Sequence, residues 1–162
     1  MNIFYLDEDP VKAAQYQYNK HVVKMILESA QMLCTAHHLI MGDDADVPYK
    51  IAHPKHPSTK WVTYSASNYA WLYQHMLALG DEYTKRYGKV HLTITKCKDK
   101  LAKLPGGIFN VGFSEPPQAM PDEYKVEGDS IKAYWNYYIG DKRHIANIKK
   151  EKIYEKRIRS SY

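Results

Sequence analysis

The segment between Pro10 and Gly42 contains neither glycine nor proline, and this absence constrains the fold more than any other feature of the sequence. Glycine and proline are the residues that most often interrupt helices, so a long stretch without either favours one extended helix. Asp9 suits the N-cap position, and Pro10 suits the first helical position. The sequence therefore predicts a helix that begins at Pro10 and runs to about His38, before a polar loop at residues 42–57.

A second long helix is predicted to begin at Pro57 or Ser58 and to run to Arg86. Gly88 follows at the position where a left-handed residue commonly ends a helix. Residues 89–103 are predicted to form a shorter helix, because a proline and two glycines stand directly after them.

Proline and glycine gather in residues 105–128, which hold four of the eight prolines and four of the eight glycines. A segment of this length and composition predicts an ordered loop that forms a rigid wall of a site. A last helix is predicted after an N-cap at Asp129, and it continues towards Lys156 with a candidate break at Gly140. Residues 2–6 are predicted to form either a short strand or a buried N-terminal segment.

These elements predict an all-α fold, a compact single domain over residues 1–162 with three to four helices, two of them long. A length of 162 residues suits one domain, and an aromatic content of 13% argues against disorder. The two cysteines, Cys34 and Cys97, lie in helical stretches, which excludes a disulfide-stapled secreted domain. No apolar run reaches the roughly 18 residues of a membrane span, and the N-terminus lacks the features of a signal peptide. We therefore expect a soluble intracellular protein.

The formal net charge of +5 belongs to the end of the chain. Residues 141–162 contain eight Lys or Arg and three Asp or Glu, whereas residues 1–140 are formally neutral. This basic C-terminal helix or tail has two interpretations. It is a solvated helix end whose basic residues complement the helix dipole, or it binds the phosphates of nucleic acid.

Polar side chains follow one line along the first predicted helix. They are His21, Lys24, Glu28, Gln31, Thr35 and His38. Spacings of three and four residues place them on one stripe, and the residues on both sides of it are apolar. A helix with so narrow a polar stripe is expected to be mostly buried, so its polar groups need protein partners or a ligand. The alternative is a solvent-facing stripe in which Lys24 and Glu28 form an ion pair.

The second predicted helix has a similar stripe with more aromatic residues. Its members are Lys60, Tyr64, Asn68, Trp71 and His75. Aromatic residues at helical spacing most often belong to the core. Together with lysine, asparagine and histidine they also offer the stacking surface and hydrogen bonds that a base-plus-phosphate ligand uses.

The loop before this second helix suits an anion. Ser58 would stand where free backbone N–H groups and the helix dipole favour phosphate, with His56 just before it and Lys55 and Lys60 adding charge. The alternative is an ordinary N-cap with exposed lysines. Gln118, in the proline-rich segment, is the last of the candidate ligand-binding residues.

Other chemistries lack their usual patterns. No spacing of histidine or cysteine matches a strong zinc motif, and neither a glycine-rich phosphate loop nor a nucleophile elbow occurs. Cys34 lies among apolar residues, which disfavour the reactive thiolate. We therefore expect no metal and no cofactor.

Five motifs are distributed over most of the chain. They are Lys20-His21-Val22-Val23-Lys24-Met25-Ile26-Leu27-Glu28, His56-Pro57-Ser58-Thr59-Lys60-Trp61-Val62, Arg86-Tyr87-Gly88-Lys89-Val90-His91, Pro116-Pro117-Gln118-Ala119-Met120-Pro121-Asp122-Glu123-Tyr124-Lys125 and Tyr134-Trp135-Asn136-Tyr137-Tyr138. Together they resemble a family of small, largely uncharacterised tailed-phage proteins. This resemblance implies a viral protein that acts in the host bacterial cytoplasm, and it names no activity.

The first half of the chain has a distinctive order: an N-terminal segment, a polar helix with a lysine-rich turn at residues 20–24, and His56-Pro57 before an aromatic helix. Over residues 1–90 this order is similar to the phage pyrimidine-dimer DNA glycosylase (endonuclease V) superfamily. The resemblance implies an all-α fold and catalysis by an exposed N-terminal α-amine with a helix-borne glutamate. Asn2 is larger than the residues that usually permit removal of Met1. Glu28 lies one turn beyond the expected position of that glutamate and is the only acid on the stripe.

Two functions stay open. The favoured hypothesis is a phage protein that binds a phosphate-bearing nucleotide, or a small molecule derived from one, in a pocket lined by helix-borne Lys, His, Tyr and Trp. Such a protein would sequester a host defence signal. The alternative is a DNA-repair enzyme, a pyrimidine-dimer glycosylase/lyase, with Glu28 or His21 as acid or base. DNA is a further candidate partner through the basic C-terminus, no membrane partner is expected, and the oligomeric state is not predicted.

Overall fold

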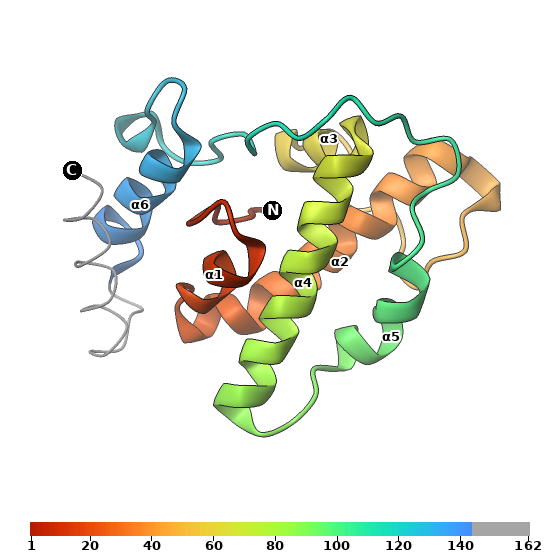
Figure 1. The fold of residues 1–162 in the computed structure, drawn as a ribbon, viewed down its shortest axis with the longest axis horizontal. Coiled ribbons are helices and arrows are strands. Elements are labelled where there is room, and N and C mark those ends of the chain that lie inside the picture. The colour runs from red at the N-terminus through yellow and green to blue at the C-terminus, as the bar shows by residue number, and fades with distance from the viewer. Residues whose placement is uncertain (144–162) are drawn as a thin grey trace.

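Helices supply all the regular secondary structure in the part of the chain that the structure, a computed structural model, describes, which is residues 1–143 (Figure 1). The elements are α1 (Pro10–Gln15), α2 (Asn19–Met41), the 3₁₀ turn η1 (Gly42–Asp44), α3 (Pro57–Tyr64), α4 (Ala66–Tyr87), α5 (Leu92–Leu101), the 3₁₀ turn η2 (Asp122–Tyr124) and α6 (Ser130–Gly140). The predicted all-α class is confirmed, with six α-helices among these residues where three to four were expected. None of the described helices is long and apolar enough to cross a membrane.

The first long helix is in fact two, so the prediction of one helix over residues 10–38 is wrong. The chain leaves helical conformation at Tyr18 (φ −60°, ψ 152°), between α1 and α2. The side chain of Tyr138, on α6, accepts the backbone N–H of Tyr18 at 3.1 Å and stacks on its ring. Arg86, on α4, donates to the carbonyl of Gln17 at 2.8 Å. These distant partners satisfy backbone groups that a continuous helix would have paired internally.

The second long helix also divides, at Ser65 (φ −149°, ψ 140°), so the prediction of one helix to Arg86 is wrong as well. The hydroxyl of Ser65 donates to the carbonyl of Gly112 at 2.7 Å, and the N–H of Ala66 donates to that of Phe109 at 2.9 Å. Both acceptors belong to the proline- and glycine-rich loop, which crosses over α3 and α4 on its way from α5 to α6 (Figure 1). The hydrogen bonds from this loop therefore stabilise the break at Ser65, although residues 58–79 contain neither glycine nor proline.

Signals local to the helix ends are confirmed. The side chains of Asp9 and Asp129 accept backbone N–H groups in the first turns of α1 and α6. Gly88 adopts the left-handed conformation (φ 73°) that ends α4. α6 ends at Gly140, the candidate break. The predicted continuation of this helix and most of the basic tail lie outside the described residues.

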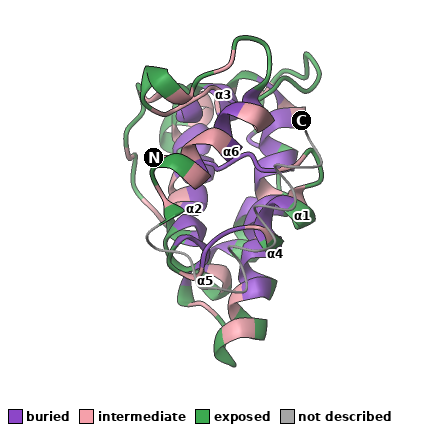
Figure 2. Ribbon diagram, turned by 90° about the vertical axis from the view of Figure 1, so that its left-hand side faces the viewer, coloured by how far each residue is buried: buried purple, intermediate pink, exposed green. Residues whose placement is uncertain are grey.

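The core forms where α2 and α4 pack against each other, with α1, α3 and α5 placed around them (Figure 1). The buried parts of these helices face the interior in Figure 2. Residues 3–6 lie in this interior as a buried segment without strand pairing, which decides between the two predicted alternatives. Trp135 of α6 donates its indole N–H to the carbonyl of Leu6 at 2.9 Å. The core therefore determines where the first residues of the chain lie.

His75, on α4, is enclosed completely by this core. Its Nδ1 lies 2.9 Å from the carbonyl of Pro10, and its Nε2 lies 3.1 Å from the side-chain amide nitrogen of Gln17. A neutral ring that donates through Nδ1 and accepts through Nε2 satisfies both partners. Burial lowers the pKa of His75 from its ordinary 6.5 to about 4, although hydrogen bonds to backbone groups oppose the shift.

Stability is expected to fall as the pH drops from 6.5 towards 4. In this range the unfolded chain binds a proton at His75 and the folded chain does not, so the stability present above 6.5 is lost by up to about 3 kcal/mol. Urea unfolding at neutral pH and near pH 4 should show a smaller pH dependence in His75→Gln than in the wild type. Equal pH dependence in the two proteins would contradict this role for His75.

Candidate active site

The α-amino group of Met1 lies 3.4 Å from Oε1 of Glu28, on α2. The Glu28 side chain is only 13% exposed, and the Met1 side chain is 3% exposed. The Glu28 carboxylate is thus largely screened from water, while Met1 as a whole is only partly buried, and the charge of the amine acts on this carboxylate more strongly than at the surface. An amine and a carboxylate at this separation can exchange a proton, which is the basic requirement for an amine nucleophile.

Asn2 fixes the position of this amine. Its Nδ2 donates to the carbonyl of Ala119 at 2.9 Å, and its Oδ1 accepts the backbone N–H groups of Ile3 at 2.7 Å and Phe4 at 3.1 Å. The chain bends sharply directly afterwards, because Phe4 has a positive φ of 56°. A non-glycine residue in this conformation is strained, so the surrounding contacts must hold it. The hydrogen bond from Asn2 to Ala119 therefore attaches the N-terminal segment to the proline-rich loop.

His21 packs against this N-terminal segment. Its ring stacks on that of Phe4, with centroids 4.2 Å apart and planes 13° from parallel. Its Nδ1 lies 2.6 Å from the hydroxyl of Tyr138. His21 is buried, and these contacts suit a residue that positions the N-terminal segment.

Two positive groups lie close to Glu28, the Met1 amine and Lys24. Nζ of Lys24 lies 3.8 Å from its Oε2, which is the ion pair that the solvent-facing alternative predicted, and the Lys24 side chain is 72% exposed. His56 also lies near the pair: burial lowers its pKa, and so do the positive charges of the Met1 amine and of His53, while the Glu28 carboxylate acts in the opposite direction. The Met1 amine and Lys24 are thus the two cations beside this screened carboxylate, and they suit the approach of a polyanion.

The rest of the α2 stripe has other partners. Gln31 lies one turn beyond Glu28 and is partly exposed. Thr35 both accepts from the N–H of Ala52 at 3.0 Å and lies 3.3 Å from its carbonyl, while the ring of His38 bonds the carbonyl of Tyr49 at 2.8 Å. These two residues hold the loop between α2 and α3. The residues near Glu28 therefore belong to the candidate site, whereas Thr35 and His38 have structural roles.

The second predicted stripe does not exist as one surface, because the break at Ser65 separates Lys60 and Tyr64 from the others. Both of these lie exposed on α3. The three residues on α4 are buried and have internal hydrogen bonds. Asn68 bonds Trp61 and Ser114, Trp71 bonds the carbonyl of Glu8, and His75 bonds Pro10 and Gln17.

The start of α3 differs from the predicted anion site. His56 is the N-cap, and its Nδ1 accepts the N–H of Ser58 at 3.1 Å. The hydroxyl of Ser58 is buried and has no hydrogen-bond partner among the described residues. This hydroxyl therefore does not lie on the surface, and the anion site at the start of α3 stays a prediction. Gln118 also has a structural role, since its side-chain amide bonds both backbone groups of Val126 at 2.6 Å and 2.9 Å.

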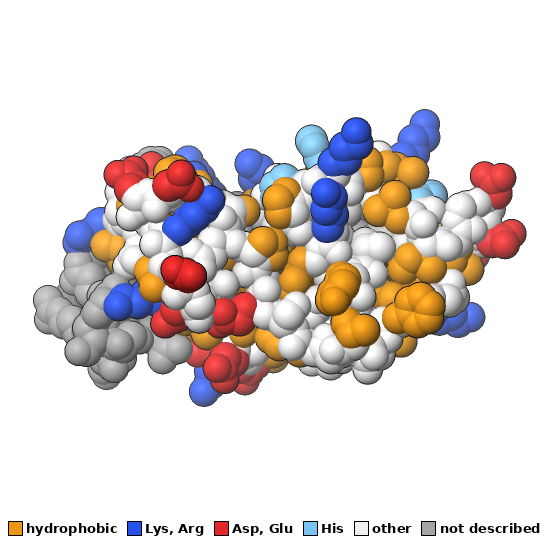
Figure 3. All heavy atoms as spheres, turned by 90° about the horizontal axis from the view of Figure 1, so that it is seen from above, with side chains coloured by type: hydrophobic (Ala, Val, Ile, Leu, Met, Phe, Trp, Pro, Cys, Tyr) orange, Lys and Arg blue, Asp and Glu red, His pale blue; other side chains and the backbone are white. Residues whose placement is uncertain are grey.

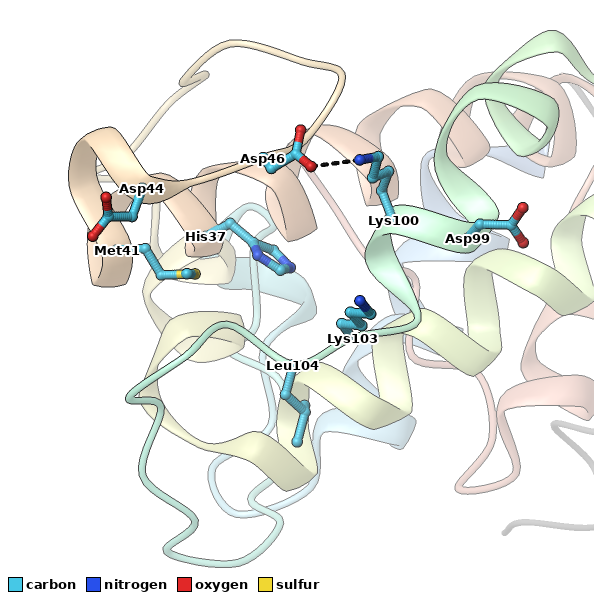
Figure 4. A pocket seen from close by; sticks show the side chains of 8 residues that line it. All are labelled: His37, Met41, Asp44, Asp46, Asp99, Lys100, Lys103 and Leu104. Atoms are coloured by element: carbon cyan, nitrogen blue, oxygen red, sulfur yellow. Dashed lines mark hydrogen bonds and ion pairs between the residues drawn. The ribbon is translucent and has the colours of Figure 1, made fainter.

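A pocket of about 460 Å³ lies elsewhere, between the C-terminal end of α2 and the end of α5 (Figure 4). Its lining combines His37 with three aspartates and two lysines, of which Lys100 and Asp46 form an ion pair. The ring of His37 bonds the hydroxyl of Tyr69 at 2.8 Å, and burial lowers its pKa. None of the candidate residues lines this pocket. Within residues 1–143, no three His, Cys, Asp or Glu side chains are grouped to hold a metal ion.

An all-α fold with a screened carboxylate beside an α-amine, among cations, corresponds to the class of protein that the endonuclease V resemblance implied. The comparison with protein families agrees, because residues 1–95 match the model for pyrimidine dimer DNA glycosylase. The match covers more than half of the chain, and the chain belongs to this family. No curated protein and no solved structure matched it.

The matched region contains Met1, Glu28 and His56, and it ends within α5. Family membership favours the DNA-repair alternative over nucleotide sequestration, for which the comparisons give no support. The proline-rich loop and α6 lie beyond the match, although Ala119 and Tyr138 in them position the N-terminal segment.

Sequence reasoning missed the role of Asn2 and its partner Ala119, which are 117 residues apart. No local pattern identifies such a pair. His56 was predicted to belong to an anion site, and its position near Met1 and Glu28 was not foreseen. A histidine directly before Pro57 is a weak signal for an N-cap, and only the packing of α3 against α2 brings it near the pair.

Proposed function

We propose that this protein is a DNA glycosylase/lyase that acts on pyrimidine dimers in duplex DNA. The observation that carries the proposal is the 3.4 Å separation between the Met1 amine and the Glu28 carboxylate. Membership of the pyrimidine dimer DNA glycosylase family supplies the substrate class. His21 is a positioning residue in this proposal, because its contacts are with Phe4 and Tyr138.

In the first step the lone pair of the Met1 amine attacks C1′ of the damaged nucleotide. The new N–C1′ bond forms as the glycosidic bond breaks, and the bonding electrons leave with the base. Glu28, still a carboxylate, stabilises the positive charge that develops on the sugar as the base leaves, and it then accepts the proton that the newly bonded amine loses.

In the second step the sugar opens to an imine. The C1′–O4′ bond breaks, and the O4′ oxygen takes up a proton that Glu28 can return. Loss of a proton from C2′ then expels the 3′ phosphate and nicks the strand, while water later releases the sugar from the amine. In this proposal the exposed Lys24 and the exposed lysines of the α3 region bind the phosphate backbone.

The test uses duplex DNA that carries a single cyclobutane pyrimidine dimer. We expect strand nicking at the dimer, and we expect borohydride to trap a covalent protein–DNA complex whose cross-link maps by mass spectrometry to the Met1 amine. The same duplex without the dimer is the control and should be neither nicked nor trapped. Base release that leaves an intact abasic site, without trapping, would indicate activated water in place of the amine, and no reaction at large enzyme excess would contradict the proposal.

A further inference from the structure

Large apolar side chains project into solvent beside the break between α3 and α4. Phe109 is 81% exposed, Val111 is 61% exposed and Phe113 is 45% exposed. Tyr64, the last residue of α3, is also exposed. These four residues are here called the apolar ridge. Hydrophobic side chains gather on this face in Figure 3, with Lys and His side chains near them. A cluster of exposed apolar groups of this size indicates a binding surface.

The ridge is held by a firmly bonded backbone. The carbonyl of Phe109 accepts the N–H of Ala66. The hydroxyl of Ser65 donates to the carbonyl of Gly112 and accepts the N–H of Val111. Oδ1 of Asn110 accepts hydrogen bonds from groups of Ser65, Ser67 and Gly112. The polar groups of the loop thus bond the protein, while Phe109 and Val111 are exposed, and the ring of Phe113 packs against Trp61 and anchors the loop. A surface already ordered in this way loses little entropy on binding.

Two elements connect the ridge with the candidate active site. α3 begins directly after His56, whose pKa responds to the charges of the Met1 amine and Glu28, and it ends at Tyr64. Eight helical residues span about 12 Å, the length of a few stacked base pairs. The same loop that carries Phe109 also supplies the carbonyl of Ala119 to Asn2. One loop therefore links the ridge to the N-terminal segment that carries the Met1 amine.

The space between ridge and site is suited to a nucleic-acid strand. A shallow cavity of about 270 Å³ lies between α3 and the loop, lined in part by Lys60, Tyr64 and Trp61. Glu115 also lines it, and its carboxylate accepts the N–H of Ser130 at 3.3 Å. Lys60 is exposed and can meet a phosphate on the path from the ridge to the amine.

We propose that the apolar ridge is a wedge that contacts the bases of duplex DNA next to the lesion and holds the stack open. This inference rests on the proposed function. An enzyme that acts at C1′ must separate its target nucleotide from the neighbouring bases, and apolar side chains inserted between base steps stabilise such a distorted duplex. Phe109 and Val111 supply the apolar groups, and the bonded loop holds them in place.

The test compares Phe109→Ser/Val111→Ser with Val90→Ser/Leu92→Ser. The control residues are similarly exposed and lie at the other end of α4. Both pairs are made in the Glu28→Gln background, so that the DNA stays intact. The probe is a dimer-containing duplex with 2-aminopurine beside the lesion, whose fluorescence rises when a base loses its stacking. The ridge variant is expected to bind about ten-fold more weakly and to lose the fluorescence rise, whereas the control pair keeps both.

Further measurements separate the two proposals. With Glu28 restored, the ridge variant should still be trapped by borohydride on a single-stranded abasic site, since no stack has to be opened there. Affinity and fluorescence equal to those of the control would overturn the wedge. So would sedimentation showing that the ridge substitutions dissociate an oligomer, because the ridge would then join copies of this chain. Failure of trapping in the wild type, with the fluorescence rise intact, would overturn the proposed function alone.

Discussion

Glu28→Gln is expected to lower the rate of dimer-specific nicking by about 10²- to 10⁴-fold, the range typical of a lost general acid–base group. The amide keeps the size of the carboxylate but cannot take the proton of the Met1 amine, which lies 3.4 Å away. It also carries no charge to stabilise the developing positive charge on the sugar. Single-turnover nicking of a duplex with one dimer measures the effect.

The matched control is Glu82→Gln. Glu82 is also a screened carboxylate on a long helix, but it pairs with Arg86 at 2.8 Å, on α4. Its replacement should lower the free energy of unfolding, because it leaves the guanidinium without its charged partner, and should leave the nicking rate of the folded protein unchanged. Equal nicking by Glu28→Gln and the wild type would show that this carboxylate takes no part in the chemistry.

Adding Gly-Ser before Met1 is expected to reduce nicking and borohydride trapping below detection. Two added residues move the first amine by up to about 7 Å, and the nitrogen that remains beside Glu28 becomes an amide, which is not nucleophilic. Binding to the intact dimer duplex should be nearly unchanged, because the lysines and the apolar ridge are untouched. Nicking, trapping and binding are measured on the same preparation.

The same two residues added after Tyr162 provide the control, and this protein should nick and be trapped like the wild type. Thermal unfolding of both extended proteins shows whether the N-terminal segment still packs, since residues 3–6 belong to the core. Undiminished nicking by the N-terminally extended protein would exclude the Met1 amine as the nucleophile.

The helix ends show how far local sequence predicts this fold. The caps at Asp9 and Asp129 and the left-handed Gly88 were predicted correctly, because each depends on contacts within one turn of the residue itself. The breaks at Tyr18 and Ser65 were missed. Their backbone groups bond to α6, α4 and the proline-rich loop, so only residues far away in the sequence make a helix end there.

The candidate site divides in the same way. Periodicity on α2 placed Lys24 and Glu28 on one stripe and allowed their ion pair, which the structure contains. The prediction that the second stripe forms one surface was wrong, because the break at Ser65 separates its exposed residues from those in the core. A prediction of a shared face depends on the helix being continuous, so one error in a helix boundary changes every contact inferred beyond it.

The sequence by itself determined the all-α class, the helix caps and the position of Glu28 on α2, since propensity and spacing act over a few residues. Only the tertiary structure decided that the Met1 amine lies beside Glu28. That contact needs Asn2 to reach Ala119, Phe4 to stack on His21, and Trp135 to hold the carbonyl of Leu6. Each of these contacts joins separate elements, and its geometry follows from the packing of the whole core.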